Sequence, residues 1–177
     1  YRWSRTHNLR LRYWGRTEQP SVTQLSPVID VSDPLNIRYG NPDLKPSFQH
    51  RFNVRYQRSN PEKASSLSAY LNGAYMTNDI VSATITDVTT GRKEATYRNV
   101  SGNWNTDARV IFNVPLKNIK FSIFSMSFAR YNQGYGYSKS ISGEDAPKEF
   151  TDEDKNTNRQ ISLMEALGLN YRSDQFD

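Results

Sequence analysis

Oxygen-bearing side chains alternate in one acidic stretch, where Asp152, Asp154 and Asn156 could offer carboxylate and amide oxygens to Ca²⁺. This spacing matches the first half of a calcium-binding loop. The second half does not match, because Thr157 stands where such a loop needs glycine and Leu163 where a bidentate glutamate belongs. We therefore expect a solvated loop here, with these oxygens as a weak calcium candidate and no metal or cofactor elsewhere.

The other reactive side chains do not form a catalytic set. His7 and His50 are the only histidines, and neither has a second ligand or a nucleophile at a diagnostic spacing. The chain has no cysteine, which excludes thiol catalysis, disulfides and Cys-ligated zinc. The stretch from Gly134 to Tyr137 is not followed by the Lys-Ser/Thr pair and helix start of a phosphate-binding loop. The sequence therefore predicts that the chain is not an enzyme.

The composition indicates buried or interfacial aromatic surface without an ordinary hydrophobic core. Only 36% of the 177 residues are hydrophobic, yet 12% are aromatic, and the mean hydropathy is −0.80. The 11 tyrosines and 3 tryptophans suit places where one end of a side chain is apolar and the other is wet. No run of about 18 apolar residues occurs, which excludes a transmembrane helix, whereas a transmembrane strand needs only about 9–11 residues.

Apolar and polar residues alternate along most of the chain, which is typical of strands. In residues 48–57 the even positions are apolar or aromatic except His50, and the odd positions are polar or charged. We predict an all-β fold, an antiparallel meander of about six strands that forms part of a transmembrane β-barrel. The alternation recurs at Leu9, Leu11 and Tyr13; at Leu67, Ala69, Leu71, Gly73 and Tyr75; at Val81, Ala83 and Ile85; at Val110, Phe112 and Val114; and at Ile161, Leu163, Leu167 and Leu169.

The alternation assigns side chains to two faces. We expect lipid to meet Phe48, Phe52, Val54 and Tyr56. We expect a polar lumen to meet Arg51, Asn53 and Arg55. Because these arginines and rings project from opposite faces, they do not form a shared platform for bases, and we expect no nucleic-acid partner. Candidates for girdle or ligand-contact positions are Trp14, Tyr39, Tyr70, Tyr135 and Tyr137.

Two features depart from the pattern. After Ile123 the apolar positions shift to Phe124, Met126 and Phe128, as a β-bulge or a strand with two apolar faces would produce. Glu165 lies on the apolar face of the last strand, where a carboxylate in lipid is costly.

Long and short connections alternate along the chain, as in bacterial outer-membrane barrels. Residues 17–46 and 138–158 are predicted to be long external loops. A tight turn is predicted around Asn60-Pro61-Glu62, a hairpin tip from Asp87 to Gly91, and a second tight turn at Lys117-Asn118.

The first long connection carries a recognisable motif. The run from residue 33 to 46 resembles the N-P-L-N-I-x-x-G-N-P-x-L-K-P stretch of TonB-dependent outer-membrane receptors and their relatives in the outer-membrane β-barrel family. Asp33 stands where the family usually has asparagine. The resemblance is most specific over residues 19–60. The motif residues are Pro34, Leu35, Asn36, Ile37, Gly40, Asn41, Pro42, Leu44, Lys45 and Pro46.

The resemblance implies a segment of a receptor wall in the outer membrane of a Gram-negative cell, with outer-membrane lipid around it. Such receptors import a scarce ligand, here a glycan, a siderophore or a peptide, and TonB energises them through a plug domain. A surface lipoprotein is a further partner that the resemblance leaves open. No initiator Met or signal peptide stands at Tyr1, so we expect the chain to be part of a longer protein. The alternative is a soluble β-sandwich, such as a surface glycan-binding or adhesion module.

Overall fold

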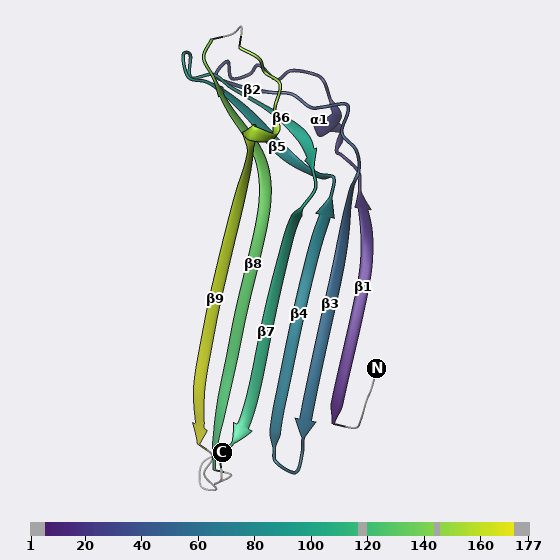
Figure 1. The fold of residues 1–177 in the computed structure, drawn as a ribbon, viewed down its shortest axis with the longest axis vertical. Helices are drawn as coiled ribbons and strands as arrows, with labels where there is room; N and C mark the ends of the chain where they lie inside the picture. The colour runs from purple at the N-terminus through teal and green to yellow at the C-terminus, as the bar shows by residue number, and fades with distance from the viewer. Residues whose placement is uncertain (1–5, 117–119, 144–145, 172–177) are drawn as a thin grey trace.

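The described residues form one open sheet of nine strands, with six long strands side by side and a smaller layer at one end (Figure 1). The computed structural model describes residues 6–116, 120–143 and 146–171. We call the six long strands the wall and the smaller layer, with its loops, the cap. The wall strands are β1 (His7–Glu18), β3 (Ser47–Asn60), β4 (Ser65–Thr77), β7 (Asn103–Pro115), β8 (Phe121–Ile141) and β9 (Lys155–Tyr171).

The wall is antiparallel throughout, in the order β1-β3-β4-β7-β8-β9. Asn60 to Ala64 close the β3–β4 hairpin by a tight turn, as predicted. The predicted turn at Lys117-Asn118 lies outside the described residues. The amide of Leu116 donates to the carbonyl of Phe121 at 2.9 Å, which joins the ends of β7 and β8.

The cap corrects the predicted topology. The chain leaves the wall at Asn78, whose φ of 53° breaks the strand, and forms the hairpin β5 (Asp79–Asp87) and β6 (Lys93–Val100). β5 pairs in parallel with the upper part of β8, and β2 (Asn36–Arg38) pairs in parallel with β6. The sheet is therefore mixed, with nine strands instead of about six. The alternation at residues 67–85 continues across Asn78 and concealed this break.

The two loops contain short helices. α1 (Val22–Leu25) lies between β1 and β2, with Ser21 as its N-cap. The 3₁₀ helix η1 (Asp152–Asp154) precedes β9. The wall strands run further than predicted at the second loop, because β8 continues to Ile141 and β9 begins at Lys155.

Strand register is regular in every wall pair. Within each strand, therefore, whether a residue number is odd or even decides which face of the wall its side chain lies on. One face, the apolar face, carries the even residues of β3 and β7 and the odd residues of β1, β4, β8 and β9. The opposite face, the polar face, carries the remainder. The predicted lipid-facing and lumen-facing sets of β3 fall on these opposite faces. β8 pairs without interruption with both neighbours, so the phase change at Phe124 reflects apolar residues on both sides of β8 and not a bulge.

Buried apolar side chains gather in the cap and not in the wall. Among the described residues, the buried apolar side chains of the cap are Ile37, Leu44, Ala83, Ile85 and Val100, and Ile141 at the upper end of β8 joins them. The rest of the wall contributes Ala74. Large apolar side chains of the wall are exposed, among them Leu11 at 69% and Leu163 at 78%. The cap therefore has the packing of a small soluble unit, and the wall has a bare apolar face.

Candidate functional site: the polar face beneath the cap

Arginine dominates the polar face of the wall. In register, Arg10 lies opposite Arg55, Arg12 opposite Asn53, and Arg51 opposite Trp14. On the other half of the wall, Arg109 lies opposite Phe128 and Arg130 opposite Asp107. These positions occupy three neighbouring rows across five strands. At about 7 Å between same-face rows and about 4.8 Å between strands, all six guanidinium groups fit a patch of about 15 by 20 Å.

Rings on the same face stack with these arginines. Arg55 lies 5.4 Å from the ring centroid of Tyr70, and Phe128 receives Arg109 at 5.7 Å and Arg130 at 5.2 Å. Such cation–π contacts hold guanidinium groups in place without neutralising their charge. The sequence assigned Tyr70 as a girdle or ligand-contact candidate, and the structure places it on the polar face beneath Arg55.

Amides form a line across the middle of the polar face. Asn53 donates to Asn72, and Asn72 donates to the Asp107 carboxylate at 2.8 Å. Towards the cap, a polar pocket of about 300 Å³ is lined largely by amides. Its lining includes Asn103, Asn105, Asn132, Asn158 and Gln160. This surface offers hydrogen-bond donors and acceptors to a polar ligand.

The apolar face carries aromatic side chains along β1 and β3. Phe52 covers Gly73, where a Cβ would lie 2.7 Å from the Phe52 ring. The Tyr13 hydroxyl lies 2.9 Å from Nδ1 of His50, and the Tyr56 hydroxyl lies 2.9 Å from Nδ1 of His7. Both histidines thus bond tyrosines across the β1–β3 pair, which gives them a structural role.

Glu165 lies on the apolar face, as its parity predicted. The Ser125 hydroxyl donates to its carboxylate at 2.7 Å, and Ser127 lies directly opposite in register. Ser125 is only 2% exposed, and Ala108 and Ala129 lie nearby around a depression of about 510 Å³. The serines reduce the cost of the carboxylate by supplying hydrogen bonds that lipid cannot.

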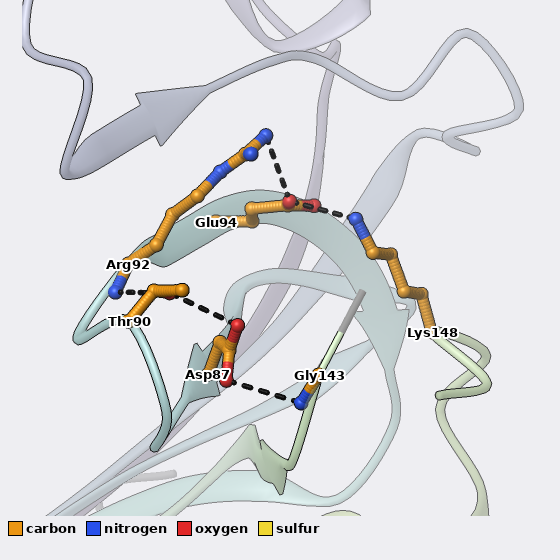
Figure 2. Close-up of polar contacts among 6 residues, drawn as sticks. All are labelled: Asp87, Thr90, Arg92, Glu94, Gly143 and Lys148. Carbon is orange, nitrogen blue, oxygen red and sulfur yellow. Dashed lines mark hydrogen bonds and ion pairs between the residues drawn. The ribbon is translucent and has the colours of Figure 1, made fainter. Parts of the chain in front are cut away.

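Figure 2 shows how the hairpin tip of the cap is fastened to the second loop. Asp87, at the end of β5, accepts bonds from the amide of Thr89 at 2.8 Å, the hydroxyl of Thr90 at 2.9 Å and the amide of Gly143 at 3.3 Å. These bonds, with that from Thr89 the largest cause, hold the pKa of Asp87 below its usual value of 3.8. Asp87 therefore acts as an ionised anchor between β5 and the start of the second loop.

Glu94 forms a second link between the same parts (Figure 2). Its carboxylate lies 3.2 Å from Arg92 and 2.8 Å from Lys148, which belongs to the second loop. Further along β6, Arg98 donates to the carbonyl of Phe150 at 3.0 Å and stacks on Tyr137 at 4.8 Å. Polar contacts thus fold the second loop down onto β6.

The motif residues of the first loop are fastened to β6 from the other side. Ile37 is buried in β2, opposite Glu94. Asn41 donates to the carbonyl of Tyr97 at 3.0 Å, and Lys45 exchanges bonds with the Asn99 side chain at 2.8 and 2.9 Å. These contacts give the motif a structural role, because they seat the first loop on the cap.

Gly40 and Asp33 fix the backbone of the motif. A Cβ on Gly40 would lie 2.5 Å from the carbonyl oxygen of Ser26, so only glycine allows this approach. The carboxylate of Asp33 accepts from the amide of Leu35 and the side chain of Asn36. Both bonds lower the pKa of Asp33, that from Asn36 first. The substituted Asp33 thus still closes the turn.

Two of the three calcium candidates, Asp154 and Asn156, bond to protein partners. Asp154 accepts from the amide of Thr151 at 2.7 Å and lies 3.7 Å from Lys139, contacts that lower its pKa. Asn156 donates to Ser138 at 2.6 Å. Within residues 6–116, 120–143 and 146–171, no three His, Cys, Asp or Glu side chains are grouped to hold a metal ion.

The remaining aromatic candidates divide between wall and cap. Trp14 lies on the polar face opposite Arg51. Tyr135 lies in β8 with Lys155 3.9 Å from its ring centroid, and Tyr137 packs at the top of β8 against Phe150. Tyr39 is half-buried beside β6, and burial, followed by the charge of Glu94, raises its pKa. The structure does not bring these aromatics together at one site.

The arrangement of the sheet and its sequence agree with one known family. The model of the outer membrane protein beta-barrel family matches residues 1–173. The chain belongs to this family. Membership makes the six long strands part of a barrel wall in the outer membrane, with the apolar face toward lipid. No curated protein and no solved structure matches the chain significantly. None of the helices in the described ranges is long and apolar enough to span a membrane.

Proposed function

We propose that this outer-membrane barrel segment belongs to the wall of a TonB-dependent receptor that imports a scarce ligand. The observation that carries the proposal is the seating of the 33–46 motif in the cap. The motif, which resembles that of these receptors, is bound to the cap. Asn41 and Lys45 bind β6 through specific side-chain and backbone contacts. The first loop is thereby built into a folded surface at the mouth end of the wall.

The two-faced wall supports the same function. A receptor wall needs an apolar outside for lipid and a polar inside along which a polar ligand can pass. The polar face offers arginines and amides together with the pocket of about 300 Å³ below the cap. The ligand can be a glycan, a siderophore or a peptide, because amide and guanidinium groups serve all three.

The described residues do not form the second sheet that a soluble β-sandwich would need. A sandwich would bury the apolar face between two sheets. The described strands instead belong to one sheet, and Leu11, Phe52 and Leu163 on its apolar face remain exposed. The barrel therefore accounts for these side chains better than the surface adhesion module does.

TonB, reached through a plug domain, is the proposed source of energy, and a surface lipoprotein is a further proposed partner. The test is growth of the source cell on single scarce nutrients after the gene is deleted, compared with deletion of the TonB gene. We expect both deletions to abolish growth on the same nutrient and complementation to restore it. A barrel mutant that grows normally on every nutrient requiring TonB would contradict the proposal.

A further inference from the structure

The arginines of the polar face form no ion pair with the acidic side chains that the structure describes. The ion pairs among the described residues lie at the upper edge of the wall or in the cap. None of them involves the arginines of the patch, Arg10, Arg12, Arg51, Arg55, Arg109 and Arg130. Asp107 is the one acid within their rows, and its Oδ2 accepts from Asn72. The described patch thus combines six cations with one anion.

The arginine patch destabilises the sheet when no anion is bound to it. Arg10 and Arg55 lie directly opposite each other on neighbouring strands, and like charges in this position destabilise a sheet. Nε of Arg55 is also buried without a hydrogen-bond partner. An acceptor with negative charge, placed above these strands, would offset both costs.

The chemistry of the patch favours carboxylate or phosphate groups. Guanidinium presents a planar fork of donors that matches both groups bidentately, and it retains its charge at any physiological pH. Tyr70 and Phe128 hold three of the guanidinium groups by stacking, which leaves their edges available for such bonds. Because the arginines spread over about 15 by 20 Å, several anionic groups can be held together.

We propose that the polar face binds a solute carrying two or more carboxylate or phosphate groups, and that this polyanion is the class of ligand the barrel imports. The proposal rests on the receptor function above, which it narrows from any polar ligand to an anionic one. The amide-lined pocket below the cap begins in the row of Arg51, at Asn105 and Asn132, and extends one row further up the same face. A polyanion that enters from the cap would first contact the neutral amides of the pocket and then the guanidinium groups of the patch.

Binding to the detergent-purified intact protein tests the proposal with citrate as the carboxylate probe, tripolyphosphate as the phosphate probe and sucrose as the neutral control. We expect saturable binding of at least one polyanion, weakened by salt, and none of sucrose. In the double variant Arg10→Gln/Arg55→Gln we expect affinity to fall at least tenfold. Which probe binds distinguishes the two sources of negative charge.

Arg58→Gln is the matched control, because Arg58 lies on the same strand as Arg55 but on the apolar face. It changes the net charge of the protein as each patch substitution does, and we expect its affinity to stay within about twofold of the wild type. Absence of binding by both polyanions, or an equal loss in Arg58→Gln, would overturn the proposal. The assay needs neither TonB nor uptake, so its failure is distinct from failure of the receptor function.

Discussion

The wall and the cap solve the problem of burying apolar surface in different ways. The wall leaves side chains such as Leu163 78% exposed and uses regular pairing to keep them on one face. The cap encloses Ile85, which is 2% exposed. Polar contacts hold the second loop to the hairpin through Gly143 and Lys148 (Figure 2), and others hold the first loop to β6. The wall therefore depends on lipid as its second layer, whereas the cap carries its own core. Substitutions should accordingly damage one region without the other.

The largest effect is expected for a charge on the apolar face of the wall. Leu71, on β4, lies between Val54 and Ala108. Arginine near the centre of a lipid-facing strand costs about 2–4 kcal/mol. We expect Leu71→Arg to reduce the folded, outer-membrane form strongly, measured by its heat-modifiable migration on gels. Ser68→Arg, on the polar face of the same strand, should fold nearly as the wild type does, and equal loss in both would refute the two-faced wall.

A smaller and local effect is expected in the core of the cap. Ile85→Ala should remove about 2–5 kcal/mol of packing from the hairpin. Hydrogen exchange should then speed up in residues 79–100 while β3 and β4 keep their protection. Val88→Ala, at an exposed position of the hairpin tip, is the control and should change little. Loss of protection across the whole wall would show that the two regions are not separable.

The smallest effect concerns acid. Because the pKa of Asp87 is lowered in the fold, its carboxylate stabilises the cap well above pH 3.8 and loses this contribution as the pH falls through the lowered pKa. We expect protection factors of the hairpin tip, corrected for intrinsic exchange, to decline below about pH 4. In Asp87→Asn they should be low already at neutral pH and change less on acidification. A wild-type tip that stays equally protected at pH 3 would contradict this role.

Sequence patterns predicted the wall far better than the cap, for a physical reason. A strand that separates lipid from a polar interior must alternate, so residues 48–57 reveal both their conformation and their faces. β2 and β6 carry no such constraint, since β2 has three residues and β6 is covered partly on both sides. Their parallel partners lie far away in the chain. The nine-stranded mixed sheet therefore could not be read from local pattern.

The candidate site was partly predictable. Parity placed Arg51, Asn53 and Arg55 on one face, and the structure confirms that they share it. Parity also set Arg109 of β7 opposite the apolar positions, but its place in the row of Arg55 depends on the pairing of β3, β4 and β7. The face of Arg130 was undecided, because the apolar phase changes within β8. Parity also placed Glu165 correctly on the apolar face, but its bond to Ser125 required the β8–β9 register. The residues that bind the motif, such as Asn99, could not be predicted from local sequence patterns, because they lie far from it in the chain.

Solvent accessibility along β3 in the membrane tests the central claim most directly. The chain has no cysteine, so single cysteines can carry spin labels at positions 52 to 56 in turn. We expect the labels at 52, 54 and 56 to collide preferentially with oxygen dissolved in lipid, and those at 53 and 55 with a water-soluble nickel chelate. Equal exposure of all five labels to the chelate would contradict a wall with one face in lipid and the other in a polar lumen.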